Sequence, residues 1–158
     1  MSAVVEEAFI HIRPMAEEDL TDVLAIETRA YDFPWSRTIF RDCLRVGYCC
    51  WVLERDGVLE GYCVMSVAVG ECHILNLCIH PDTHGMGLGR RLLDYMLDIA
   101  VEHRADSAFL EVRPSNDPAK QLYRSSGFDD VGVRRNYYPA SFGREDAIIM
   151  ARSLMPQN

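Results

Sequence analysis

The sequence lacks an excess of basic residues, and this limits the partners that it can bind. Its 158 residues include 24 Asp and Glu against 16 Lys and Arg, a formal net charge of −8. Nucleic acids and anionic membranes are bound by basic surfaces. We therefore expect neither a nucleic-acid nor a membrane partner. The acidic balance suits a basic substrate, and it is equally explained as a device for solubility.

The sequence also lacks targeting and membrane-spanning signals. Its first nine residues, "MSAVVEEAF", contain no basic segment followed by a long apolar one, so they do not resemble a signal peptide. No uncharged apolar run approaches the ~18 residues that cross a bilayer. We therefore expect a cytoplasmic protein.

Cysteine pairs with metal-ligand spacing are absent as well. The six cysteines stand at positions 43, 49, 50, 63, 72 and 78, none of them in a CxxC pattern. Most lie in apolar, strand-like runs. This placement predicts buried free thiols rather than a zinc site or a disulfide framework, and no metal is expected.

The remaining composition is that of a soluble globular protein, with 49% apolar and 25% charged residues. No linker, repeat or low-complexity segment interrupts the chain, so we expect one domain over residues 1–158. Apolar periodicity and turn residues predict an α/β fold with a mixed sheet, in the order β-α-α-β-β-β-α-β-α-β-β. The predicted elements span residues 8–14, 15–30, 37–46, 48–55, 58–69, 72–80, 88–100, 107–114, 115–128, 129–139 and 145–154. The strand–helix–strand unit from His73 to Pro114 predicts two parallel strands with a right-handed crossover, and helices on both faces of the sheet.

A glycine-rich loop, "HGMGLG", precedes the amphipathic helix at 88–100. Gly85, Gly87 and Gly89 would let an anion approach the free N–H groups at the helix N-terminus. The loop is not a P-loop, because no Gly-Lys is followed by Ser or Thr. It is not the GxGxxG dinucleotide motif, because Arg90 and Leu92 stand where that motif needs its last glycine. On these residues alone, a plain turn at a helix entry explains it almost as well.

This loop resembles the pyrophosphate loop of the GCN5-related N-acetyltransferases, written [QR]-x-x-G-x-[GA]. Gly87 and Gly89 match, whereas His84 stands where that family favours Gln or Arg. The predicted element order is also similar to that family's over the whole chain. The resemblance implies acetyl-CoA as co-substrate. It implies that the cofactor contacts the loop and the backbone of the preceding strand, through Leu77, Cys78, Ile79, Gly85, Met86, Gly87, Leu88, Gly89 and Arg90.

Four further segments narrow the resemblance. They are similar to the bacterial enzymes that acetylate the N-terminal alanine of a small-subunit ribosomal protein: "ETRAYDFPWS", "LEVRPSNDPAKQLYRSSGF", "VGVRRNYYP" and "GREDAIIM". The resemblance implies an N-alpha-acetyltransferase that acts on a protein N-terminus. The alternatives are an acetyltransferase for lysine or a small amine, and a non-catalytic acyl-CoA-binding sensor.

Three residues in the second half of the chain receive roles from this resemblance. Glu111, on the same strand face as Phe109 and Arg113, matches the glutamate that accepts a proton; otherwise it is an exposed strand glutamate. Tyr123 matches the tyrosine that protonates the leaving thiolate; otherwise it is a half-buried aromatic. Asn116 matches an asparagine that hydrogen-bonds the cofactor; otherwise it caps a helix.

The peptide-binding surface is the least defined part of the sequence. Aromatic residues gather in an early loop, at Tyr31, Phe33 and Trp35, and late in the chain, at Tyr137 and Tyr138. They predict either a wall of a peptide groove or a cover for the core, and for Trp35 we expect the core. Glu27 offers charge to a cationic N-terminus, but we expect it on a solvated helix face. Cys78 has no histidine partner in any motif, so a cysteine nucleophile is not expected.

Overall fold

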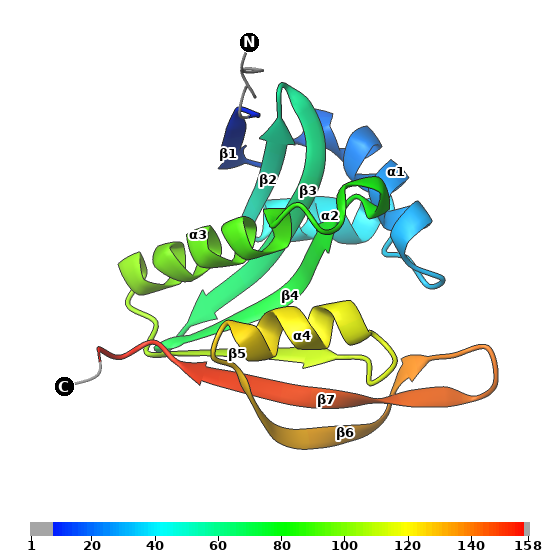
Figure 1. The fold of residues 1–158 in the computed structure, drawn as a ribbon, viewed down its shortest axis with the longest axis vertical. Helices are drawn as coiled ribbons and strands as arrows, with labels where there is room; N and C mark the ends of the chain where they lie inside the picture. Colours follow the sequence, from blue (N-terminus) through cyan, green and yellow to red (C-terminus); the bar gives the residue numbers. More distant parts are fainter. Residues whose placement is uncertain (1–7, 157–158) are drawn as a thin grey trace, which may run out of the picture.

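A computed structural model describes residues 8–156, which form a seven-stranded sheet with helices on both faces (Figure 1). The strands are β1 (Ile10–Pro14), β2 (Cys49–Arg55), β3 (Val58–Ala68), β4 (Glu71–Ile79), β5 (Ser107–Val112), β6 (Asp129–Pro139) and β7 (Arg144–Ser153). The α-helices are α1 (Leu20–Ala30), α2 (Arg37–Arg45), α3 (Leu88–Glu102) and α4 (Asp117–Ser125). The predicted α/β class and order of strands and helices are confirmed.

The sheet has the strand order β1-β2-β3-β4-β5-β7-β6. β4 and β5 are parallel, and the other neighbouring strands are antiparallel. The parallel pair is joined through α3, as the strand–helix–strand pattern predicts. Short turns join most of the antiparallel neighbours. At the β2–β3 turn, Asp56 and Gly57 both have positive φ, 52° and 82°, as a two-residue hairpin turn requires.

Two apolar clusters hold the helices to opposite faces of the sheet. One cluster packs α3 and α4 against the face that carries Ile74 and Leu110. The other packs α1 and α2 against the opposite face, which carries Val52, Tyr62 and Val64. In Figure 1, α3 and α4 lie in front of the sheet, and α1 and α2 lie behind β2–β4. The second face of β5–β7 therefore has no helix over it within the described residues.

β4 and β5 separate part-way along their length, and this separation creates the site. Their pairing ends at Ile74 and Leu110. On the other side of β4, the pairing with β3 skips Leu75, because Met65 faces Ile74 whereas Val64 faces Asn76. Such a bulge bends its strand. β4 beyond Ile74 therefore has a strand partner on one side only, and in Figure 1 the two strands diverge toward the right of the view.

The cysteines are free thiols, as their spacing predicts. Five are buried and Cys49 is half-buried. Burial raises their pKa values, in the case of Cys72 to about 11, so they stay protonated and unreactive.

In the described part of the chain, no helix is long and apolar enough to cross a membrane.

Candidate active site

Two cavities meet at the point where β4 and β5 diverge. The loop cavity, of about 620 Å³, lies beside the glycine-rich loop. The groove cavity, of about 790 Å³, lies between the segment that joins α1 to α2 and the β6–β7 hairpin. Residues from α1, its following loop, β4 and α4 line both cavities: Ala30, Tyr31, Leu77, Asn116, Pro118, Ala119 and Tyr123. A molecule in one cavity can therefore reach a molecule in the other.

The glycine loop has the backbone that an anion-binding helix entry requires. Gly85 and Gly87 have φ of 84° and 75°, and no atom lies within 4 Å of the position that a Cβ would take. Their backbone conformation, rather than crowding, requires glycine. Gly89 lies inside α3, where a Cβ would come 3.3 Å from a Leu122 methyl group. The loop thus leaves the backbone at the N-terminus of α3 accessible to a ligand, and the helix dipole there favours an anion.

His84 fastens this loop to the end of β4. Its Nε2 lies 2.9 Å from the carbonyl oxygen of Ile79. A carbonyl only accepts hydrogen bonds, so Nε2 carries a hydrogen and donates.

Arg90 hydrogen-bonds the Ser125 hydroxyl on α4, at the rim of the loop cavity. Leu88 lines this cavity as well, whereas the Met86 side chain is 55% exposed and lies outside the lining.

Three consecutive residues of β4, Leu77, Cys78 and Ile79, line the loop cavity. The Tyr31 hydroxyl donates to the Leu77 carbonyl oxygen at 3.3 Å, which joins the loop after α1 to β4. Cys78 is buried, and burial raises its thiol pKa to about 11. A thiol with this pKa is a poor nucleophile, in agreement with the sequence-based view of Cys78.

Tyr123 and Asn116 lie where the two cavities meet. The Tyr123 ring is buried in α4 and packs edge-on against Phe128, with centroids 5.8 Å apart. Burial raises the pKa of its phenol above the ordinary value, so the hydroxyl keeps its proton at neutral pH. Asn116 caps α4, because its Oδ1 accepts from the Ala119 N–H at 3.3 Å. Only its amide Nδ2 remains to donate to a ligand.

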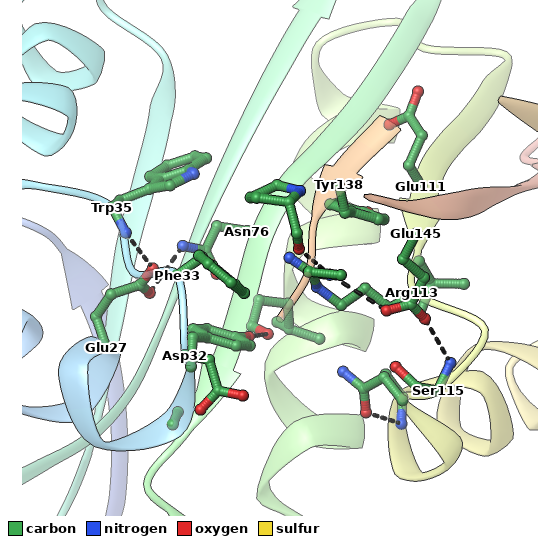
Figure 2. Close-up of a pocket in the computed structure, with 18 of the residues that line it drawn as sticks. Glu27, Asp32, Phe33, Trp35, Asn76, Glu111, Arg113, Ser115, Tyr138 and Glu145 are labelled. Carbon is green, nitrogen blue, oxygen red and sulfur yellow. Dashed lines mark hydrogen bonds and ion pairs between the residues drawn. The ribbon is translucent and has the colours of Figure 1, made fainter. Parts of the chain in front are cut away.

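Glu111 is not the exposed strand glutamate of the alternative interpretation. Its side chain is 9% exposed. One oxygen, Oε2, lies 2.5 Å from His73 Nε2, and the other, Oε1, accepts from Arg134 Nε at 3.2 Å. Glu111 is among the residues that line the groove cavity, and in Figure 2 its carboxylate points away from Arg113. The sequence did not reveal His73 and Arg134, because they come from β4 and β6.

The expectation that Glu27 lies on a solvated helix face is wrong, because its side chain is 2% exposed. It accepts hydrogen bonds from the Tyr62 hydroxyl at 2.6 Å, from Asn76 Nδ2 at 3.0 Å and from the Trp35 backbone N–H at 2.9 Å. Figure 2 shows the last two bonds. Glu27 therefore fixes the loop after α1 against β3 and β4. The spacing carried a signal, since Glu27 lies seven residues after the buried Leu20, on the same helix face.

Arg113 closes the far side of the groove cavity. Its guanidinium lies over the rings of Tyr138 and Phe33, 4.3 and 5.6 Å from their centroids. It also donates to Glu145, at 3.2 Å. The Ser115 N–H hydrogen-bonds the same carboxylate and, together with Arg113, lowers its pKa. The early and late aromatic segments thus meet through Arg113, as expected of a groove wall.

Two further aromatic residues, Trp35 and Tyr137, pack against other rings. Trp35 packs on Phe40, with ring centroids 5.2 Å apart, and it also lines the groove cavity. It therefore serves both the core and the groove. Tyr137 packs edge-to-face against Tyr138 and lies outside the cavity lining.

A sheet that opens beside a glycine loop, with a second cavity for an acceptor, defines the acyltransferase class of the N-acetyltransferase fold. The model of the Acetyltransferase (GNAT) family matches residues 14–128, and the chain belongs to this family. It is 39% identical over 140 residues to [ribosomal protein bS18]-alanine N-acetyltransferase from Escherichia coli K12, covering 89% of this chain and 95% of that one. A similar protein of Bacillus subtilis is 36% identical over 141 residues, covering 88% and 92%.

Solved structures agree with this assignment. The crystal structure of the ribosomal-protein-S18-alanine N-acetyltransferase from Escherichia coli has a TM-score of 0.87 and 36% identity, covering 95% of this chain and 97% of that chain. The Salmonella typhimurium protein yncA, solved with its cofactor acetyl-CoA, has a TM-score of 0.76 and 22% identity, covering 94% and 95%. The second likeness establishes the fold alone.

Proposed function

We propose that this enzyme is an N-alpha-acetyltransferase that transfers acetyl from acetyl-CoA to the N-terminal alanine of a small-subunit ribosomal protein, bS18. The observation that carries the proposal is the 39% identity to the Escherichia coli enzyme named for that substrate, in a match that covers 95% of that enzyme. The groove cavity supports it, because this cavity of about 790 Å³ adjoins the loop cavity and has room for the end of a peptide. The alternatives are acetylation of lysine or a small amine, and a non-catalytic acyl-CoA sensor.

The cofactor assignment is supported by the fit of the residues that surround the loop cavity. A pyrophosphate group fits the N-terminus of α3. Gly85 and Gly87 there have a backbone conformation, with positive φ, that residues with a side chain rarely adopt. A pantetheine arm fits beside Leu77–Ile79, where β4 has no partner strand on the β5 side. When bound there, acetyl-CoA supplies the thioester that carries the acetyl group.

The ordinary pKa of the acceptor amine favours an N-terminus over a lysine. An α-amino group has a pKa of ~7.8, so roughly a third of it is neutral near pH 7.5. A lysine with a pKa of ~10.4 is neutral only about 0.1% of the time, which costs about 4 kcal/mol. Only a neutral amine attacks a thioester. A modest base such as a carboxylate therefore suffices for an N-terminus.

Glu111 and Tyr123 then take complementary roles. As the amine nitrogen forms its bond to the acetyl carbon, Glu111 accepts the proton that the nitrogen loses. As the carbon–sulfur bond breaks, the Tyr123 hydroxyl gives its proton to the departing sulfur. The raised pKa of Tyr123 supports this role, since the hydroxyl holds a proton to give throughout the neutral range. We expect a backbone N–H of β4 next to the loop cavity to polarise the thioester carbonyl.

The test is a peptide panel with acetyl-CoA, read by mass. We expect acetylation of a peptide that carries the bS18 N-terminus with alanine first, and at least tenfold lower rates when another residue replaces that alanine. The matched control is the same peptide with a blocked N-terminus and an added lysine. Equal or faster modification of the blocked lysine peptide contradicts the proposal in favour of lysine acetylation. Acetyl-CoA binding without turnover on any amine would establish a sensor.

A further inference from the structure

The two contacts of the Glu111 carboxylate are unequal. Oε2 is 2.5 Å from His73 Nε2, whereas Oε1 is 3.2 Å from Arg134 Nε. The His73 side chain is 35% exposed and that of Arg134 is 55% exposed. A carboxylate only accepts, so Nε2 of His73 carries the hydrogen in this contact. Each carboxylate oxygen can accept more than one hydrogen bond, so Oε1, which makes the longer contact, can still accept another proton.

His73 reaches Glu111 because of the sheet. It lies opposite Phe109 in the parallel pairing of β4 and β5. Glu111 is two residues further along β5, so it shares a sheet face with Phe109. This contact occurs next to the last paired residues, Ile74 and Leu110, where the two strands begin to diverge. The histidine thus holds the carboxylate at the inner end of the opening between the strands.

We propose that His73 is a positioning residue for the reaction: its Nε2–H fixes Oε2 of Glu111 so that Oε1 faces the acceptor amine. This inference rests on the proposed function. A glutamate in a strand has several rotamers, and a base must lie within about 3 Å of the proton that it accepts, directly or through one water. Without His73, only the contact with the more exposed Arg134 holds the side chain. Exposed ion pairs hold geometry weakly.

The test compares three variants on the alanine peptide. His73→Phe keeps a ring but removes the donor, and we expect kcat to fall about 10- to 100-fold, as for loss of a hydrogen bond to a charged group. KM for the peptide and Kd for acetyl-CoA should stay within twofold. His73→Gln restores an N–H donor of similar reach and should recover kcat to within about threefold of the parent. Arg134→Gln, the matched control, should cost about threefold or less.

A double-mutant cycle with Glu111→Gln distinguishes positioning from an independent effect. Once the carboxylate is gone, His73→Phe should change kcat by less than about twofold. Full additivity of the two losses would overturn the inference. So would a His73→Gln variant that is as slow as His73→Phe at an unchanged melting temperature.

A readout that needs no turnover separates this inference from the proposed function. The chemical shifts of His73 Nε2 and its hydrogen should report a hydrogen-bonded Nε2–H in the parent protein, and loss of that hydrogen bond in Glu111→Met. Unchanged shifts would refute the contact itself. If the parent acetylates no peptide with an N-terminal alanine, the proposed function fails. The role of His73 then fails with it, even where the shifts establish the contact.

Discussion

The loop cavity and the groove cavity meet at Tyr123, yet they are built in different ways. About half of the residues that line the loop cavity come from one continuous stretch, from Leu77 to Arg90, and its distinctive groups are backbone N–H groups at a helix entry. The groove cavity is formed by side chains from α1, the loop after it, β4, β5 and the β6–β7 hairpin. Its groups meet only because the sheet brings distant segments together.

Because of this difference, the two cavities tolerate amino-acid substitutions differently. A backbone site depends on φ angles, so a single substitution at a glycine that needs positive φ disables it, whereas side chains around it can vary. A side-chain site depends on hydrogen-bond partners, so the loss of one acceptor leaves several donors without a partner. Substitutions at Tyr123, which lines both cavities, at Gly87 and at Glu27 separate the two modes of construction.

The largest effect is expected at Tyr123, which belongs to both cavities. Tyr123→Phe keeps the ring packed against Phe128 and deletes only the hydroxyl. General acid catalysis contributes ~10²–10⁴ in rate, and a coenzyme A thiolate is a fair leaving group because its pKa is close to that of cysteine, ~8.5. We therefore expect about 10²-fold lower kcat and kcat/KM, with little change in acetyl-CoA or peptide affinity. Retention of more than half the parent turnover, with chemistry rate-limiting, would make Tyr123 a packing residue.

The next effect is expected at Gly87 and should be confined to the loop cavity. Acetyl-CoA at a hundredfold excess over its Kd should stabilise the parent by about 2.7 kcal/mol. Gly87 has φ of 75°, which valine rarely adopts, so Gly87→Val should distort the helix entry and remove most of that gain. The measurement is the free energy of unfolding with and without acetyl-CoA.

Gly57→Val is the matched control for Gly87→Val. Gly57 has φ of 82° and an equally open surrounding, but it lies in the β2–β3 turn. Both variants should lose a similar amount of stability without ligand, because both place valine in the left-handed region. Only Gly57→Val should keep the acetyl-CoA gain. Equal gains in the two variants would show that the glycine loop does not bind the cofactor.

The same difference decides how much could be predicted from the sequence. The order of strands and helices along the chain was predictable because period-2 and period-3.6 patterns, with turns such as Asp56–Gly57, are local. The glycine loop of this cavity was predictable because its three glycines lie within five residues, just before a helix. His73 and Arg134 could not be found, since their contact with Glu111 depends on strand register.

Glu27 shows the limit of local reasoning within a helix. Its charge suggested solvent, but the fold places it on the apolar face of α1 and provides three donors. A buried carboxylate is tolerated only with such partners. No pattern within α1 predicts those donors, because they come from β3, β4 and the loop before α2.

The smallest effect is expected at Glu27, and it should be confined to the groove cavity. Glu27→Met keeps the length of the side chain but offers no acceptor to Tyr62, Asn76 and the Trp35 N–H. Unpaired buried donors cost ~1–3 kcal/mol, partly offset because no charge remains buried, so we expect about 2 kcal/mol less stability. Peptide KM should rise, because Trp35 lines the groove cavity, while acetyl-CoA affinity stays unchanged. Urea unfolding and ligand titration measure these quantities.

Glu27→Gln is the control that tests the reason for this loss. The Trp35 N–H can only donate, so the glutamine oxygen must face it, and the glutamine NH₂ then faces Tyr62 and Asn76. A hydroxyl can rotate to accept, and an asparagine amide can turn its oxygen toward a donor. Both partners can thus adapt, and we expect Gln to cost about 1 kcal/mol or less, with peptide KM close to that of the parent. Equal losses for Met and Gln would mean that the negative charge of Glu27, rather than its accepting oxygens, holds the groove together.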